Sequence, residues 1–486
     1  MTAMGATARS LMIAGTASHV GKSTLVTALC RILHQRGVRV APFKAQNMAL
    51  NSWVCRDGSE IGRAQVVQAQ AAGIEPAVDM NPILLKPAGN GKIQVVLNGR
   101  VYAPMTAGDF YERRTFFLDN ALESFRRLAS KFDVILLEGA GSVAEVNLRD
   151  RDIVNLPFAK AAGAPALLVA DIDRGGVFAS VVGTFALLDD SERDIVRGFV
   201  INRFRGDPRF FAGGPEFLEK RTGKPCLGVL PHIDSLRLDQ EDSVSLEDRQ
   251  GKDGIFRVGV IRLPHISNYT DFNPLESIPG VAVEYLSESH HAPPDLAIIP
   301  GTKNTIGDLH WLIAHGFKQL LTDTMERGGW LLGICGGYQM LGRSVTDQQG
   351  VEEGGFVEAL DFLPVQTELK LDKITTQSGG RSFLGTAVTG YEIHMGRTEY
   401  RGPVQAFITK NDGASDGAVS GRVCGTYFHG LFENADFTTK FLTAVAQDRK
   451  LEWRPAAIHY SKDGEYDRLA DIFRQHLDME RIYGII

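Results

Sequence analysis

Residues 328–342 read GGWLLGICGGYQMLG, and this stretch decides how the second half of the chain folds. The apolar run from Trp330 to Ile334 predicts a buried strand, and the residues after Cys335 suit the start of a helix. Glycines on both sides of Cys335 allow the sharp strand-to-helix turn that exposes a nucleophile. A single cysteine is usually a small core residue, but these glycines and the nearby Gln339 favour catalysis. We predict that Cys335 is a nucleophile.

A nucleophilic cysteine needs donors for the oxyanion that it creates. Residues 296–299 predict a strand that delivers the sequence PGTKN at 300–304. Backbone N–H groups around Gly301 are candidates for one half of an oxyanion hole, and Gly336 is the candidate for the other half.

The cysteine also needs a base, and His429 is our candidate. It ends the strand expected within GTYFHGLFE, residues 425–433. His394 is a second candidate that we place along the pocket wall, whereas His290 and His291 lie in a polar loop without metal-binding spacing. A base of this kind must lie within hydrogen-bond reach of the thiol and must itself be oriented.

The first half of the chain begins with a phosphate-binding pattern. Residues 11–14 predict a buried strand, residues 15–24 read GTASHVGKST, and a helical pattern follows. In such a loop, backbone N–H groups from Gly15 to Gly21 hold phosphates, Lys22 reaches the terminal phosphates, and Ser23 binds Mg²⁺. We add Thr24 to the predicted ATP-binding residues. Five residues, rather than the usual four, separate the two glycines.

Polar side chains follow other predicted strands of this half. Lys44 comes after the strand at 38–43, and we expect it to contact ATP. Glu138 ends the strand at 132–137, where a carboxylate opposite a phosphate-binding loop suits Mg²⁺, directly or through water. Repeated strand–helix units predict an α/β fold with two doubly wound, mostly parallel sheets.

Composition limits the class of protein. The 486 residues include 44% apolar and 23% charged side chains with a formal net charge of −6, which gives no basic nucleic-acid footprint. The five scattered cysteines fit a reducing compartment, and the first apolar run is too short to span a membrane. We expect a cytoplasmic protein with neither nucleic-acid nor membrane partners, and we leave its oligomeric state open.

The predicted domains follow changes in pattern along the chain. We expect a domain with the phosphate-binding loop at 1–235, a charged linker at 236–255 and a domain with the Cys335 turn at 256–450. Residues 451–486 form an expected helical tail.

Both halves resemble known families. The longer phosphate-binding loop is similar to that of dethiobiotin synthetases, and residues 333–339 resemble the G-x-C-x-G-x-Q elbow of class I glutamine amidotransferases. Their combination, with QNMALNS at 46–52, EIGRAQ at 60–65 and PGTKNT at 300–305, resembles the cobyric acid synthase family. The resemblance implies glutamine hydrolysis at Cys335, with Gln339 in the glutamine site. It also implies ATP-dependent amidation of corrinoid carboxylates b, d, e and g.

One position departs from the resemblance. Class I glutaminases commonly have a glutamate two residues after the histidine, where this chain has Leu431. Either Glu433 orients His429, or the site works as a Cys–His pair.

Three alternatives remain. A cobyrinic acid a,c-diamide synthase shares both domain types, but residues 46–52 argue against it. A CTP synthase also couples such domains, although residues 44–65 give no reason for a pyrimidine site. A partition-like regulatory ATPase would not need Cys335 and His429.

Overall fold

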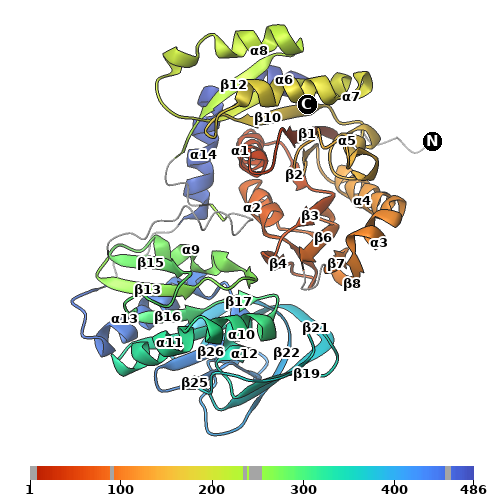
Figure 1. The fold of residues 1–486 in the computed structure, drawn as a ribbon. Helices are drawn as coiled ribbons and strands as arrows, with labels where there is room; N and C mark the ends of the chain where they lie inside the picture. The colour runs from red at the N-terminus through yellow and green to blue at the C-terminus, as the bar shows by residue number, and fades with distance from the viewer. Residues whose placement is uncertain (1–7, 88–91, 234–237, 240–253, 455–460) are drawn as a thin grey trace.

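The computed structural model describes residues 8–87, 92–233, 238–239, 254–454 and 461–486. Figure 1 shows the two halves of the chain as two α/β bodies, the first in red to yellow and the second in green to blue. The tail in blue returns to the first body, so the C-terminal helices belong to the same half of the molecule as the segments drawn in red.

The first body is built on a six-stranded parallel sheet with the order β12-β11-β10-β1-β9-β2. Successive strands of the chain are placed on opposite sides of β1. In open α/β sheets, ligands bind at the carboxyl ends of the strands where the strand order changes direction in this way. The strands are β1 (Arg9–Gly15), β2 (Val40–Phe43), β9 (Val134–Glu138), β10 (Ala166–Asp171), β11 (Val196–Phe204) and β12 (Cys226–Pro231).

Helices cover both faces of this sheet because successive side chains of a strand point to opposite faces. Leu11 and Ile13 pack in one core with α1, whereas Met12 and Ala14 pack in another with α4, α5 and α6. The helices are α1 (Lys22–Gln35), α2 (Arg63–Ala71), α3 (Ala107–Glu112), α4 (Arg114–Ala129), α5 (Leu156–Ala161), α6 (Val177–Leu187), α7 (Asp190–Ile195) and α8 (Gly214–Thr222).

Two small sheets follow β2, and the sequence pattern did not predict them. A four-stranded sheet has the order β3-β6-β7-β8, and β4 pairs with β5. Figure 1 places this region beside the second body. The strands are β3 (Gln46–Met48), β4 (Ser52–Val54), β5 (Glu60–Gly62), β6 (Ile83–Pro87), β7 (Lys92–Leu97) and β8 (Arg100–Thr106).

The second body has a six-stranded sheet with the order β15-β13-β16-β18-β26-β25, in which β25 alone is antiparallel to its neighbour. Its strands are β13 (Phe256–Ile261), β15 (Val281–Leu286), β16 (Leu296–Ile299), β18 (Trp330–Ile334), β25 (Ala418–Ser420) and β26 (Val423–Thr426). Its helices are α9 (Asn273–Glu276), α10 (Thr305–Ala314), α11 (Phe317–Glu326), α12 (Gly336–Met340) and α13 (Ala435–Asp448).

A largely antiparallel sheet flanks this body and carries the histidine expected as the base. Its main path is β20-β19-β21-β22-β27, dominated by the long hairpin of β21 and β22. The strands are β19 (Ser344–Asp347), β20 (Gly355–Glu358), β21 (Val365–Ser382), β22 (Ala387–Tyr400), β23 (Ile408–Lys410), β24 (Ser415–Asp416) and β27 (Phe428–His429). A short ladder joins β14 (Ile266–Ser267) to β17 (Gly301–Thr302).

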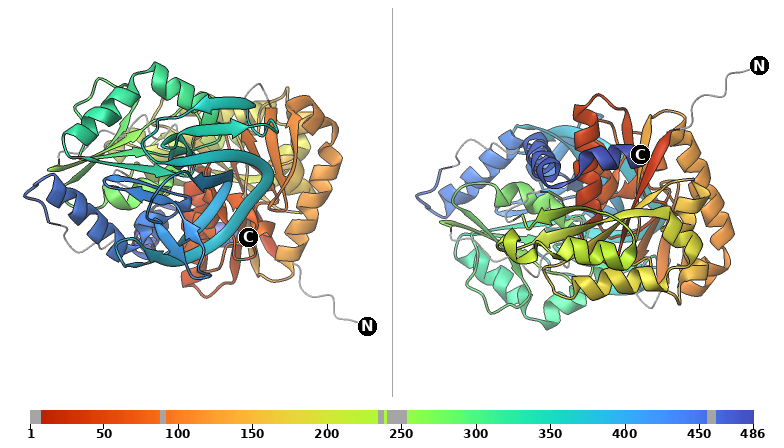
Figure 2. Two further views of the ribbon diagram at one scale, coloured as in Figure 1. Left: turned by 90° about the horizontal axis from the view of Figure 1, so that it is seen from below. Right: turned by 90° about the horizontal axis from the view of Figure 1, so that it is seen from above.

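The C-terminal helices α14 (Lys462–His476) and α15 (Met479–Ile485) pack on the first body. Leu469 and Phe473 of α14 share a buried core with Leu25 and Leu29 of α1. Figure 2 shows the same pairing from above, with the blue helices against the red one. The residues expected as a tail therefore complete the first domain.

Most of the linker expected at 236–255 lies outside the described residues. Of its described part, Leu238 joins the core that contains α1, and the Asp239 carboxylate forms a buried ion pair with Arg63. The chain is thus anchored just after the first domain.

The predicted fold class, two mostly parallel α/β domains, is confirmed. Within the described part of the chain, every helix is too short or too polar to cross a bilayer.

Candidate functional site

The turn between β18 and α12 presents the Cys335 side chain. Cys335 has φ 53° and ψ −109°, a conformation that residues other than glycine rarely adopt. Gly337 makes the turn possible, because a Cβ atom there would lie 1.9 Å from the carbonyl oxygen of Ile299. The Cys335 amide donates to the carbonyl oxygen of Thr426, which ties the turn to β26. Backbone strain is therefore located at the expected nucleophile.

His429 on β27 lies within hydrogen-bonding reach of the Cys335 thiol. Its Nδ1 atom is 2.6 Å from Oδ2 of Asp271, and the other carboxylate oxygen accepts a hydrogen bond from the Gly430 amide at 3.0 Å. The carboxylate favours a proton on Nδ1, which leaves Nε2 to exchange a proton with the thiol. Burial lowers the pKa of His429, but the charge of Asp271 outweighs it and raises this pKa to about 10.

Asp271 therefore occupies the orienting position that the sequence left open. It lies 158 residues before His429, in the polar loop after β13. Glu433 does not contact His429, since its carboxylate accepts from Arg63 at 3.1 Å and from Lys462 at 2.7 Å. Residues 264–275 read PHISNYTDFNPL, and so polar a segment after a buried strand indicates a functional loop. Only the fold shows which of its residues contacts the histidine.

The residues expected around the oxyanion lie close to this group. Gly336 is the first residue of α12, and Gly301 packs so near the His429 ring that a Cβ atom there would be 3.2 Å from Cε1. Gln339 is buried and held at both ends of its amide: Thr305 Oγ1 donates to it at 3.1 Å, and it donates to the Tyr427 hydroxyl at 3.2 Å. Gly336 and Gln339 line a pocket with Cys335 and His429.

His394, the second histidine considered, also lines that pocket but has other partners. Its Nδ1 atom lies 2.9 Å from the carbonyl oxygen of Gly396, and its ring stacks on Tyr427 with centroids 3.6 Å apart. Burial lowers its pKa despite the nearby Glu392 carboxylate. His394 thus fits a wall residue better than a base.

The other four cysteines are packing residues. Burial raises the pKa of Cys55 and of Cys226 to about 11, and it raises the pKa of Cys30 and Cys424 further. A thiol with a raised pKa carries little thiolate near neutral pH and is a poor nucleophile.

The loop after β1 has the arrangement of a phosphate-binding loop. Gly15 ends β1, and Gly21 precedes α1 with φ 99°. A Cβ atom at Gly21 would lie 2.0 Å from the amide nitrogen of Asn202, which donates to the Val20 carbonyl oxygen at 2.8 Å. Lys22 Nζ donates to the carbonyl oxygens of Ala17 and Gly141, at 2.9 and 3.0 Å, so its ammonium lies over the loop.

Opposite this loop, the Glu138 carboxylate accepts hydrogen bonds from three separate segments of the chain. Its carboxylate accepts from Ser23 Oγ at 2.8 Å, Lys44 Nζ at 2.9 Å and Gln68 Nε2 at 2.5 Å. Burial raises the pKa of Glu138, but the Lys44 ammonium outweighs it and the net pKa is lowered. Gln68 on α2 was not predicted: glutamines occupy positions 65, 68 and 70 of this helix, and only the fold shows that Gln68 contacts Glu138.

Ser23 and Glu138 together fit a magnesium ion. Mg²⁺ keeps several waters and takes one or two protein oxygens beside the phosphates of its nucleotide. The described residues include no cluster of three or more acidic, histidine or cysteine ligands. Both residues line a cavity of about 1340 Å³ together with Gly21, Lys22, Thr24 and Lys44.

Comparison with known proteins agrees with both sites. Residues 11–245 match the CobQ/CobB/MinD/ParA nucleotide binding domain, and residues 257–437 match the CobB/CobQ-like glutamine amidotransferase domain. The cobyric acid synthase of Dehalococcoides mccartyi (strain CBDB1) is 46% identical, over 99% of both chains. The chain belongs to the cobyric acid synthase family. The enzymes of that name from Caldanaerobacter subterraneus subsp. tengcongensis and Photorhabdus laumondii are each 47% identical, over 99% and 98% of this chain and 99% and 97% of theirs.

In this member of the cobyric acid synthase family, residues 46–52 connect the two sites. Gln46, Asn47 and Met48 line the large cavity, whereas Leu50 and Ser52 line the pocket beside Cys335. The segment therefore borders both the cavity at the phosphate-binding loop and the pocket beside Cys335.

Hydrogen bonds fix this segment to the glutaminase domain. The Ser52 amide donates to Asn268 Oδ1 at 3.0 Å, and the Tyr391 hydroxyl donates to the Ser52 carbonyl oxygen at 3.2 Å. Nearby, Lys373 from the long hairpin pairs with Glu60 at 2.5 Å. These buried contacts hold the domains in one relative position.

Proposed function

We propose that the chain is a glutamine-hydrolysing, ATP-dependent cobyric acid synthase that amidates peripheral carboxylates of a corrinoid. The observation that carries this proposal is the residue 46–52 segment, which has a glutaminase pocket at one end and a phosphate-binding cavity at the other. Membership of the family supplies the corrinoid as substrate.

In the glutaminase pocket, Cys335 gives its proton to Nε2 of His429, and Asp271 stabilises the imidazolium that forms. The thiolate attacks the side-chain carbonyl carbon of glutamine, and backbone N–H groups at Gly336 and near Gly301 stabilise the oxyanion. The C–N bond then breaks, and ammonia leaves with a proton from His429. Water hydrolyses the thioester, which releases glutamate and restores the thiol.

In the synthase cavity, a corrinoid carboxylate oxygen attacks the γ-phosphorus of ATP, and the bond to the bridging oxygen of ADP breaks. Lys22 stabilises the charge on the moving phosphoryl group, and Lys44 lies beside the same site. Ammonia then attacks the acyl carbon and displaces phosphate, leaving the amide. Ser23 and Glu138 would hold Mg²⁺, which when bound would neutralise charge at the phosphates.

Ammonia made at Cys335 is proposed to travel along residues 46–52, because these residues border both compartments. We assign the b, d, e and g carboxylates of the a,c-diamide as its targets, on the basis of the family resemblance. Cobyrinic acid a,c-diamide synthase chemistry is the competing assignment, and it differs only in the carboxylates accepted.

The test is mass spectrometry of cobyrinic acid a,c-diamide incubated with the protein, ATP, Mg²⁺ and glutamine. We expect stepwise gain of four amides. Glutaminase activity without change in this corrinoid would remove the substrate assignment and leave the chemistry.

A Cys335→Ala variant tests the two-site mechanism. It should lose glutamine-dependent synthesis, because the thioester cannot form, and keep synthesis from added ammonium. Loss of both activities in a folded variant would contradict separate sites.

A further inference from the structure

The pocket beside Cys335 has a charged wall that the mechanism above does not use. Its volume is about 60 Å³. One water needs about 10–15 Å³ by a comparable measure, so the pocket admits a small polar molecule. Lys303 and Glu352 line it together with the nucleophile.

Among the described residues, no carboxylate is in contact with the Lys303 ammonium. Across the described residues, its ammonium makes no ion pair within 4.0 Å and no side-chain hydrogen bond, although it is half-buried. Burial lowers the pKa of Lys303, and the neighbouring Lys373 ammonium lowers it further. An anion bound beside Lys303 would stabilise the charged ammonium and so offset the effects of burial and of Lys373 on its pKa.

Glu352 lies on the loop between β19 and β20 and is held in place by its surroundings. Asp347 accepts from the amides of Val351, Glu352 and Gly354 at 2.8, 2.8 and 2.9 Å, which fixes this loop. The Glu352 carboxylate accepts from the Thr305 amide at 2.5 Å. Burial raises the pKa of Glu352 to about 7 despite the nearby Lys303 charge.

The segments that carry Lys303 and Glu352 are hydrogen-bonded to each other. Lys303 lies in the turn between β17 and α10, and Thr305, which binds Glu352, begins α10. Asn304 of the same turn donates to Glu353 of the acidic loop. The turn and the loop therefore present an ammonium and a carboxylate at a defined separation beside the nucleophile.

We propose that Lys303 and Glu352 bind the two charged groups of glutamine, Lys303 the α-carboxylate and Glu352 the α-ammonium. This inference rests on the proposed glutaminase function and adds the residues that select the free amino acid. A zwitterion matches both charges, whereas a protein-bound glutamine or a simple amide lacks them. Cys335 acts on the other end of the substrate.

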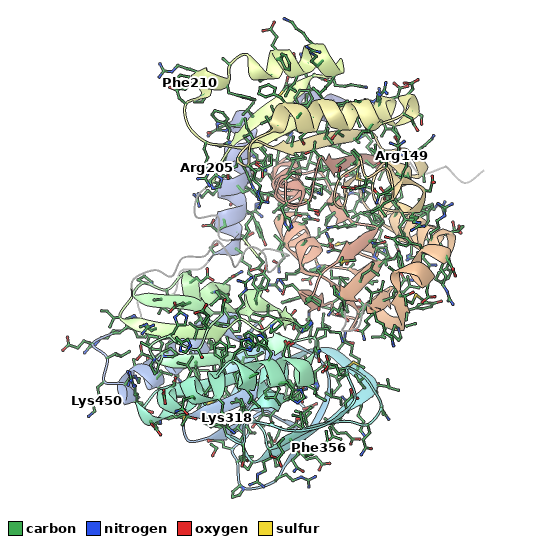
Figure 3. The ribbon with its side chains drawn as sticks, in the orientation of Figure 1. Arg149, Arg205, Phe210, Lys318, Phe356 and Lys450 are labelled. Atoms are coloured by element: carbon green, nitrogen blue, oxygen red, sulfur yellow. The ribbon has the colours of Figure 1, made fainter. Side chains whose placement is uncertain are left out.

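The test is the steady-state rate of glutamate formation by the full-length chain. Lys303→Met should raise KM for glutamine roughly 10- to 100-fold and change kcat little, because the lost contact is a charge-assisted hydrogen bond to an unreacting group. Lys303→Arg should recover part of the affinity. Lys318→Met is the matched control, since Lys318 is an exposed lysine of α11 in the same domain (Figure 3) and should leave KM unchanged.

Substrate analogues provide a test that begins with the wild-type chain. L-Glutaminamide, whose carboxylate is replaced by a neutral amide, should have a similarly raised KM with the wild-type chain. Lys303→Met should no longer distinguish it from glutamine. N-acetylglutamine should show the same pattern with Glu352→Gln.

Each alternative has its own outcome. A fall in kcat at constant KM would place Lys303 at the reacting atoms and overturn the proposal, as would equal KM values for glutamine and glutaminamide in the wild type. No glutamate from the wild-type chain would instead remove the glutaminase function itself.

Discussion

At the scale of single residues, the proposed mechanism requires Asp271 to orient His429. Asp271→Asn keeps the shape of the side chain but removes the charge that favours a proton on Nδ1. We expect glutamine-dependent synthesis to fall about 10²- to 10⁴-fold, the usual range for a disabled general base, while synthesis from ammonium persists. Asp412→Asn, at an exposed aspartate of the same domain, should have no effect. A loss smaller than threefold would show that His429 needs no carboxylate.

The same substitution should alter the pH profile of glutamine hydrolysis. Asp271 raises the pKa of His429 to about 10, so the imidazolium that accompanies the thiolate persists until the pH passes that value. Without the carboxylate, the pKa of His429 falls toward the ordinary value of about 6.5. We therefore expect the alkaline loss of kcat/KM to begin at lower pH in Asp271→Asn, and an unmoved alkaline limb would contradict this.

Sequence reasoning selected Cys335 and His429, which the structure places close together, but missed Asp271 for a physical reason. A strand-to-helix turn is a local feature, and its glycines mark the cysteine within a few residues. The carboxylate reaches His429 from 158 residues away, so only the packing of two sheets brings them together. Lys44 and Glu138 were predictable because parallel strands end at the same sheet edge, and the structure places their charged groups 2.9 Å apart.

At the scale of elements, α2 joins the domains through Arg63. Its guanidinium contacts Asp239 and Glu433 and lies 4.6 Å from the Trp53 ring centroid. The side chains of Arg63 and Asp239 are 3% and 4% exposed, so removing one leaves a buried charge. Arg63→Ala should lower the free energy of unfolding by about 3–5 kcal/mol, measured by urea denaturation.

A matched pair on the surface provides the control for Arg63. Arg56 and Glu75 are 2.9 Å apart but 75% and 65% exposed, and an exposed ion pair contributes about 0–1 kcal/mol. Arg56→Ala should therefore change the unfolding midpoint little. Equal effects of the two substitutions would contradict the role assigned to burial.

Other elements show which parts of the fold the sequence pattern predicts and which it does not. The strands of both parallel sheets were predictable from continuous apolar runs, because these strands are buried on both faces. The β21–β22 hairpin has mixed burial along its length and gives no such run. Helix α14 reads as helical from its sequence, but its place against α1 depends on a core shared with residues from the start of the chain.

At the scale of the whole molecule, the two proposed active sites require one fixed domain arrangement. Ammonia is small, and it is lost to solvent or protonated unless its path is enclosed. Residues 46–52 border both compartments and are tied to the glutaminase domain by Asn268 and Tyr391. Tight coupling of this kind predicts one glutamate formed per amide made.

Leu50→Trp tests this coupling, because Leu50 lines the glutaminase pocket from the side of the synthase domain. A bulkier side chain there should obstruct ammonia, and an unchanged KM for glutamine would show that the pocket beside Cys335 stays open to the substrate. We expect the ratio of glutamate to corrinoid amide to rise above one and free ammonia to appear in the medium, with synthesis from added ammonium retained. Glutamate, ammonia and amidated corrinoid are measured in the same reaction.

The control is Met48→Trp, at a half-exposed residue lining the large cavity. It should reduce synthesis from both nitrogen sources, because it crowds the corrinoid and ATP rather than the proposed ammonia path. If Leu50→Trp kept the ratio at one, ammonia would have to reach the acyl phosphate by a route that avoids this segment.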